Sequence, residues 1–339
     1  MTKTATTVLE SLNAGLRTAM RKDPNVILLG EDILDPYGGA FKVTKGCSTE
    51  FPERVFTTPI SEAAMLGIAN GLAMSGKRPV VEIMFGDFIT LAMDQILNHA
   101  SKFHWMYNES VDVPLVVRTP MGGRRGYGPT HSQSLEKHFM GIPGLTVIAP
   151  NSVIDAGDLL GTAVLESTGP ILFVEHKLLY TSSIAKIGQG DWVDFSLEVD
   201  GAKYPTATLG FSGVTKHHCT IATYGYNLEL AKKAAVELAY NDEIFCEIIV
   251  LSQLSPFDLA GIEASLKKTK KLVTIEEAGL TLGWGSEVIA QACEGQPDLL
   301  VKRVAAIDLP IGNSKALEDV ILPSEQKIVQ SIREMLKLN

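Results

Sequence analysis

The stretch Asn25–Asp32, NVILLGED, decides the fold class. An apolar run of this length that ends in glycine and acidic residues is typical of a strand buried on both faces. Helical patterns such as SEAAMLGIANGLAMSG and ITLAMDQILNHASKF separate it from further short apolar runs, at 78–85, 113–119, 145–150 and 170–176. Because strands alternate with helices, we predict a mostly parallel sheet that helices cover on both faces.

The same alternation resumes in the second half of the chain. Apolar runs recur there at 219–225, 244–252, 270–279 and 301–310. Residues 181–205 between the two halves are polar, and we interpret them as a linker. A length of 339 residues also favours two domains. The predicted fold class is therefore α/β with two doubly wound domains, at 1–180 and 206–339.

Composition excludes several classes of partner. The net charge of −9 argues against nucleic acid and against an anionic membrane surface. No apolar stretch is long enough to span a bilayer, and the N-terminal segment has the spacing of an amphipathic helix, unlike a signal peptide. The four cysteines lie far apart without a CxxC pair, so they indicate core residues in a reducing compartment. We expect a cytoplasmic protein.

Polar and aromatic side chains follow three of the predicted strands. Glu31 follows the first, Phe88 follows the second, and a loop that ends at His131 follows the third. Ligands of open α/β sheets bind beyond the carboxyl ends of the strands. We therefore predict a ligand site at this edge of the first sheet.

Glu62 lies in the first turn of the helix predicted at 61–76. Its simplest role is to complement the helix dipole at an exposed helix start. The alternative is a carboxylate that manages a proton on a ligand nitrogen. Phe85 and Phe88 flank a strand end, and their rings fit either a core position or stacking on a heterocycle.

His131 ends the stretch RTPMGGRRGYGPTHSQS at 118–134. A lone histidine is usually structural, but this one follows four glycines, which allow positive φ angles and close approach to a ligand. Arg124 and Arg125 suit an anionic substrate or a subunit contact. A histidine with a pKa near neutral can donate or accept a proton in catalysis.

These features together resemble the β subunit of the thiamine-diphosphate-dependent 2-oxo acid dehydrogenase E1 component. The matching stretches are GEDILDPYGGAFKVTKG, TPISEAAMLGIANGLAMSG, RPVVEIMFGDFITLAMDQI, HSQS and TIEEAGLTLGWGSEVIA. The resemblance implies a transketolase-like pyrimidine-binding domain followed by a transketolase C-terminal domain. It also implies decarboxylation of a 2-oxo acid and acyl transfer to a lipoyl group of an acyltransferase partner, E2.

The resemblance assigns a role to each candidate residue. Glu62 matches the glutamate that hydrogen-bonds the cofactor's aminopyrimidine and so promotes loss of the thiazolium proton. Glu31 matches a glutamate that supports this proton network, Phe88 matches the ring stacked on the pyrimidine, and His131 matches the histidine that faces substrate and acyl acceptor. In some members of the family, backbone carbonyls hold a potassium ion, near positions that correspond here to Leu115, Ala163, Val164 and Glu166.

Two departures from the family pattern carry information. Thiamine enzymes hold the diphosphate through Mg²⁺ with a GDG motif, and this chain has none. We therefore expect an α subunit to supply the diphosphate half of the site in an α2β2 heterotetramer. Ser252 stands where the family often has an arginine, before the LSP segment.

Three alternatives remain open at this point. One is a two-chain transketolase-like enzyme that uses no lipoyl acceptor, and another is a non-catalytic subunit that stabilises its partner. The third is a doubly wound nucleotide-binding protein, against which the absence of a P-loop and of a GxGxxG motif argues.

Overall fold

The computed structural model describes residues 5–337, and within this range the chain forms two compact units. The first unit combines the chain up to Gly122 with residues His138–Ile184, and the second combines Gly123–Lys137 with the chain from Ala185 onward. The segment that carries His131 therefore belongs to the second unit. No helix in the described part of the chain is long and apolar enough to cross a bilayer.

The first unit contains the predicted parallel sheet. Its strands lie in the order β5-β6-β4-β3-β1-β2, and all neighbouring pairs are parallel. The bounds are β1 Val26–Gly30, β2 Val55–Thr57, β3 Arg78–Glu82, β4 Val116–Met121, β5 Thr146–Ile148 and β6 Ile171–His176. The five strands expected from apolar runs are confirmed. The short strand β2 was not predicted, because its sequence has no apolar run.

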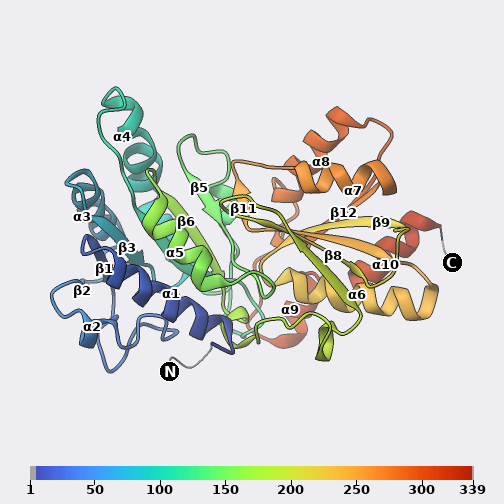
Figure 1. Ribbon diagram of the computed structural model, residues 1–339, viewed down its shortest axis with the longest axis horizontal. Helices are drawn as coiled ribbons and strands as arrows, with labels where there is room; N and C mark the ends of the chain where they lie inside the picture. Colours follow the sequence, from blue (N-terminus) through green and yellow to red (C-terminus); the bar gives the residue numbers. More distant parts are fainter. Residues whose placement is uncertain (1–4, 338–339) are drawn as a thin grey trace. The chain divides into compact units, whose positions relative to one another are not determined.

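Helices and helical turns connect these strands. They are α1 Val8–Lys22, α2 Cys47–Glu50, α3 Glu62–Met74, α4 Ser101–Met106, α5 Ala156–Glu166 and the short 3₁₀ turn η4 Leu179–Thr181. A capping box between Thr7 and Glu10 starts α1. The helices α1 and α5 lie side by side (Figure 1), and they pack so closely that a Cβ on Gly15 would lie 2.2 Å from the carbonyl oxygen of Gly157.

One local prediction in this unit, the single helix at 89–103, needs correction. Residues 89–103 do not form one α-helix, because a 3₁₀ helix, η1 Gly86–Ala92, and a π-helix, η2 Gln95–Ala100, precede α4. Ser61 occupies the N-cap position of α3, but its side chain makes no capping hydrogen bond. The end of α3 follows the usual pattern of a glycine cap, since Gly76 adopts a φ of +86° just after the C-cap Ser75.

The second unit contains a sheet in the order β13-β12-β9-β10-β8-β7. Its strands are β7 Phe195–Val199, β8 Thr206–Phe211, β9 Cys219–Tyr224, β10 Cys246–Leu251, β12 Lys271–Gly279 and β13 Leu300–Ala306. The four predicted strands are parallel to their predicted neighbours, whereas β8 and β7 add an antiparallel edge. The unit also contains the short strand β11 Gln253–Ser255.

Helices cover both faces of this second sheet. They are α6 Asn227–Asp242, α7 Ala260–Thr269, α8 Trp284–Gly295, α9 Lys315–Ile321 and α10 Glu325–Leu336. Figure 1 shows α7 and α8 on one side of the strands and α6 with α10 on the other. The 3₁₀ turn η5 Gly190–Trp192 and strand β7 lie inside the range 181–205 that we interpreted as a linker. Part of that range is therefore ordered, and the division into 1–180, 181–205 and 206–339 stays a prediction.

Candidate functional site

Strands β1, β2 and β3 bring the predicted acidic residues to one edge of the first sheet. β1 lies between the other two, and Gly30 at its end pairs with Thr57 of β2 and with Glu82 of β3. Glu31 follows β1 directly. Glu62 begins α3, which follows β2 after a short turn. The parallel register thus places both carboxylates at the carboxyl ends of neighbouring strands.

Glu31 and Glu62 are both buried, with 7% and 4% of their surface exposed. Burial raises the pKa of Glu31, and the negative charges of Glu62 and then Asp32 raise it further. The Oε1 atom of Glu31 has no hydrogen-bond partner among residues 5–337. A buried carboxylate oxygen without a donor is costly, so this position suits a ligand that brings an N–H or O–H group.

Aromatic rings lie at the end of the neighbouring strand β3. Phe85 and Phe88 are half-buried, and their ring centroids are 6.2 Å apart in an edge-to-face arrangement. Phe41 packs against the other side of Phe85, with a centroid distance of 5.7 Å. The rings therefore support one another and keep part of their surface accessible, which allows stacking on a flat ligand.

Lys177 is a residue of this region that the sequence reading missed. It is fully buried directly after β6, and its Nζ donates a hydrogen bond of 2.6 Å to the carbonyl of Gly122. The same Nζ lies 5.6 Å from the ring centroid of Phe85. The rule that we applied to Glu31, that chemistry lies just beyond strand ends, applied to β6 would have identified it.

Arg118, at the start of the stretch that we examined around His131, lies within strand β4. Its guanidinium is fully buried and binds both oxygens of Glu175 on β6 and one oxygen of Glu82 on β3. The hydroxyl of Tyr180 also donates to Glu175, at 2.6 Å. Burial raises the pKa of Glu82, and the two carboxylates raise that of Arg118. This network, fully paired around the arginine, holds three neighbouring strands together.

His131 lies in the second unit, within Gly123–Lys137. It is half-buried, its backbone N–H donates to the carbonyl of Gly128, and the hydroxyl of Thr130 lies 3.1 Å from its Nδ1. The sequence did not reveal how this segment is held. Its first residues are bound by two buried carboxylates, Glu277 and Glu318, that lie far along the chain.

The potassium site implied by the resemblance stays a prediction. Its residues lie in the first unit, where Ala163 is buried, the carbonyl of Leu115 accepts a hydrogen bond from the N–H of Ile171, and that of Val164 accepts one from Arg78. No group of three or more His, Cys, Asp or Glu side chains in the described part of the chain could hold a metal ion.

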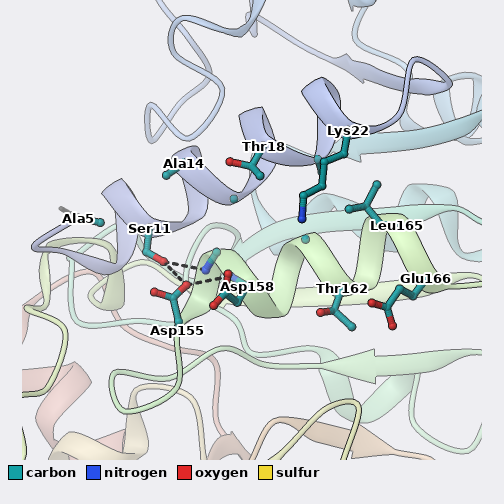
Figure 2. A pocket seen from close by; sticks show the side chains of 14 residues that line it. Ala5, Ser11, Ala14, Thr18, Lys22, Asp155, Asp158, Thr162, Leu165 and Glu166 are labelled. Atoms are coloured by element: carbon teal, nitrogen blue, oxygen red, sulfur yellow. Dashed lines mark hydrogen bonds between the residues drawn. The ribbon is translucent and has the colours of Figure 1, made fainter. Parts of the chain in front are cut away.

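The fourth of these residues, Glu166, lines a groove of about 500 Å³ between α1 and α5. Figure 2 shows its other lining side chains, among them Lys22, Asp158 and Thr162, and a hydrogen bond from Ser11 to Asp155. None of Glu31, Glu62, Phe85 and Phe88 lines this groove. It is therefore separate from the strand-end residues.

Ser252, which replaces the arginine often found in the family, is fully buried after β10. Its hydroxyl has no hydrogen-bond partner within residues 5–337. A guanidinium would not fit this position without rearrangement of its neighbours.

Comparison with known proteins agrees with this architecture. The family described as "Transketolase, pyrimidine binding domain" matches residues 5–182, and the family "Transketolase, C-terminal domain" matches residues 214–328. A solved structure of a split-gene transketolase, titled an inactive β4 tetramer, superposes with a TM-score of 0.75 at 20% identity and covers 98% of this chain and 99% of that one. This likeness concerns the fold alone.

Curated relatives resemble the chain over nearly its whole length. The pyruvate dehydrogenase E1 component subunit beta-1 of Arabidopsis thaliana, named as mitochondrial, is 36% identical and covers 96% of this chain and 88% of that protein. The corresponding β subunit of Rickettsia bellii is 35% identical over 97% and 98% of the two chains. The acetoin:2,6-dichlorophenolindophenol oxidoreductase β subunit of Bacillus subtilis is 35% identical over 96% of each. With both transketolase domains present, the chain belongs to the family of E1 β subunits of 2-oxo acid dehydrogenases.

Proposed function

We propose that this chain supplies the aminopyrimidine half of a thiamine diphosphate site and, with an α subunit, catalyses oxidative decarboxylation of a 2-oxo acid. The acyl group passes to a lipoyl group of an E2 partner. Membership of the family implies dependence on thiamine diphosphate and an E1 α partner. One observation carries the assignment of the site. The carboxylates of Glu31 and Glu62 are buried and electrostatically coupled at neighbouring strand ends, beside accessible phenyl rings.

The residues fit the pyrimidine half of the cofactor. Glu31 has a buried oxygen that lacks a hydrogen-bond donor among the described residues. Glu62 is also buried, and it lies close enough for its negative charge to raise the pKa of Glu31. In the proposed site, Glu62 accepts a hydrogen bond from the protonated nitrogen of the pyrimidine ring, and Glu31 supports this proton network as the second carboxylate of the pair. Phe88, supported by Phe85, stacks on the pyrimidine ring. When bound, the cofactor supplies the electron sink for decarboxylation.

We assign the step after decarboxylation to His131. A histidine that is half-buried on a loop can exchange its proton with a substrate while it keeps access to solvent. In this proposal it donates a proton to the incoming lipoyl sulfur. The positive charge of its imidazolium also suits the substrate carboxylate.

The remaining parts of the proposal concern ions, assembly and location. Because the chain has no GDG motif, we place the Mg²⁺ ligands on the α subunit and propose an α2β2 heterotetramer. A potassium ion at the carbonyls of Leu115, Ala163, Val164 and Glu166 is a further proposal. We also propose the cytoplasm as the location, on the basis of free, mostly buried cysteines and an acidic composition.

The test is to measure cofactor binding by calorimetry with Mg²⁺ present, on this chain alone and on the complex with its α subunit. We expect the complex to bind thiamine diphosphate and the chain alone to bind weakly, because the diphosphate ligands are missing. A panel of 2-oxo acids with an artificial electron acceptor then identifies the substrate. Tight stoichiometric binding by the chain alone would refute the half-site.

A second candidate follows from the Bacillus subtilis relative, whose name gives acetoin as the substrate. Acetoin in the same panel separates this candidate from a 2-oxo acid dehydrogenase. Activity that never requires a lipoyl acceptor would instead support a two-chain transketolase-like enzyme.

A further inference from the structure

The segment Gly123–Lys137, here called the histidine loop, is held at its start by a set of contacts that we call the loop clamp. The clamp consists of Glu277 from β12, Glu318 from α9, and Arg124 of the loop itself. All of these residues belong to the second unit. The contacts explain how a glycine-rich segment keeps one conformation.

Glu318 binds the loop through backbone N–H groups alone. The N–H of Arg124 and that of Gly126 both donate to its Oε1 atom, at 2.8 and 3.3 Å. Arg124 and Gly126 have φ angles of +69° and +68°. Backbone N–H groups that turn toward one point in this way form a concave anion site, a nest. Here the anion is a carboxylate of the protein itself.

Glu277 binds both the backbone and the side chain at the same turn. Its Oε1 accepts the N–H of Gly123 at 2.7 Å, and its Oε2 lies 3.3 Å from Nε of Arg124. The loop also packs closely here, since a Cβ on Gly123 would lie 2.7 Å from the Cδ1 methyl of Leu322 and would require that side chain to shift. Glu277 and Glu318 are each only 3% exposed. Their pairing is therefore shielded from competition by water.

Arg124 shows that the clamp imposes a conformation. A non-glycine residue in the left-handed region is strained and persists only where its surroundings fix it. Three groups fix this residue. Its N–H is bound by Glu318, its Nε by Glu277, and its terminal nitrogen by the carbonyl of Pro323. Without the two carboxylates, the turn has no reason to keep this geometry.

The far end of the histidine loop is also fixed within the second unit. Nζ of Lys137 donates to the carbonyl of Thr281 at 2.7 Å, and the buried carboxylate of Glu136 accepts the hydroxyl of Tyr224. His131 therefore lies between two anchored ends. Any change at the clamp alters where the loop presents its imidazole.

We infer that Glu277 and Glu318 are positioning residues for His131. They act through the start of the histidine loop, where they bind the backbone N–H groups of Gly123, Arg124 and Gly126. This inference rests on the proposed role of His131 in acyl transfer. It gives Glu277 and Glu318, which lie far from the loop along the chain, a role in positioning the histidine. No residue proposed for the pyrimidine site has this role.

The experiment compares variants of Glu318 in the complex with the α subunit. Glu318→Ala removes the anion from the nest, whereas Glu318→Gln keeps an oxygen acceptor in the same place. The matched control is Asp319→Ala on the same helix, because the Asp319 side chain pairs with the exposed Lys315 and, within residues 5–337, makes no hydrogen bond to the loop backbone. Amide hydrogen exchange of peptides that cover the loop is measured together with cofactor affinity and acyl transfer.

We expect Glu318→Ala to raise the exchange rate at Arg124 and Gly126 by about tenfold or more. Acyl transfer to the lipoyl group should fall by about tenfold to 10²-fold, the range expected when a catalytic group is displaced by about an ångström. Cofactor affinity should stay within about threefold, because the pyrimidine ligands lie in the first unit. Glu318→Gln should restore most of the acyl transfer, and Asp319→Ala should change neither quantity.

Different outcomes overturn different parts of the argument. Unchanged loop exchange in Glu318→Ala overturns the clamp, whatever the activity. Raised exchange with normal acyl transfer, where His131→Ala is defective, overturns the positioning role. If His131→Ala is also fully active, the proposed function of the histidine fails, whereas the exchange data still establish the clamp. If Glu318→Ala does not assemble, Glu318→Asp, which withdraws the carboxylate by one methylene, gives the same test.

Discussion

The two units bury carboxylates to a similar extent but give them different partners. In the first unit, Glu31 has an oxygen without a hydrogen-bond donor within the described residues, and its pKa is raised. In the second unit, Glu277 and Glu318 each accept backbone N–H groups from the histidine loop. Similar burial therefore accompanies a proposed ligand site in one case and a structural anchor in the other.

The difference shows that burial alone does not identify a functional carboxylate. What distinguishes the two cases is whether the protein itself supplies hydrogen-bond donors to the buried oxygens. A buried oxygen without a donor is costly unless a ligand or a bound proton satisfies it. Glu276 on β12 illustrates the case in which a bound proton satisfies the oxygen. One of its oxygens accepts the N–H of Gly285, the other has no partner among residues 5–337, and its pKa is raised to about 7.

The largest effect is expected for Arg118→Met. This variant tests buried carboxylates that are fully paired, those of Glu82 and Glu175, against the less fully paired ones described above. The variant leaves Glu82 and Glu175 buried without their cation, and breaking a buried ion pair in this way costs about 3–5 kcal/mol. Urea unfolding of the purified chain measures the loss. The control is Arg21→Met, which removes a partly exposed pair with Glu50 and should cost under about 1 kcal/mol. Equal losses in the two variants would show that the buried network is not a structural anchor.

Glu62→Gln tests the carboxylates with few donors. The amide keeps the size of the side chain but loses its negative charge, so activation of the cofactor should slow by about 10²-fold or more. Deuterium exchange at the thiazolium carbon in the assembled enzyme measures this step directly, and the unfolding midpoint should change little. An unchanged exchange rate would mean that Glu62 only complements the dipole of α3.

His131→Ala separates the second unit's contribution from that of the first. Thiazolium exchange and cofactor affinity depend on Glu62 in the first unit and should survive. Acyl transfer to the lipoyl group should fall by about 10²-fold, the typical contribution of a positioned acid. All three quantities are measured on one preparation. A parallel loss of all three would show that His131 only holds its loop in place.

The smallest effect is expected for Glu276→Gln and concerns pH. Burial, and then the charge of Glu136, raises the pKa of Glu276 from 4.5 to about 7. Stability from the bound proton is fully present below about pH 4.5 and is lost as the pH rises through about 7. The free energy of unfolding should therefore fall by about 2 kcal/mol between roughly pH 5.5 and pH 8 in the parent chain.

Glu276→Gln should flatten this pH dependence, because the amide cannot lose a proton. Urea unfolding at the two pH values measures the slope. Glu287→Gln, at an exposed position of α8, is the matched control and should keep the parent slope. If the free energy of unfolding of the parent chain does not fall between the two pH values, Glu276 is ionised throughout, and a bound proton does not satisfy its buried oxygen.

The sequence predicted the strands that are buried on both faces, and with them the positions of Glu31 after β1 and Phe88 after β3. That these residues and Glu62 form one ligand site stays a prediction. Continuous apolar runs mark such strands, and parallel pairing necessarily brings their carboxyl ends to one edge. The sequence did not predict β2, β7 and β8, because a short or half-exposed strand leaves no continuous apolar run. The replacement of one helix at 89–103 by 3₁₀, π and α segments was not predicted either, because each segment is only six or seven residues long, too short for its own periodicity to show.

The partners of the histidine loop could not be predicted for a different reason. Glu277 and Glu318 lie more than a hundred residues from Gly123, and a carboxylate that receives backbone N–H groups leaves no pattern in the sequence at either end. Lys177 was within reach of the strand-end rule. Arg118 was not, because its partners Glu82 and Glu175 lie 36 and 57 residues away along the chain and only the order of the strands in the sheet brings them together.

The path of the chain between the units has a consequence for how the protein can be divided. The chain passes into the second unit at Gly123 and returns at His138 before it leaves the first unit for good at Ile184. A fragment that ends at residue 184 would carry Leu135 and Glu136, both buried in the intact chain, without the body that buries them. The matching fragment from residue 185 would lack an inserted segment of its own core. Gene fission, domain exchange or expression of a single domain at this boundary therefore separates the segment Gly123–Lys137 from the unit in which it packs.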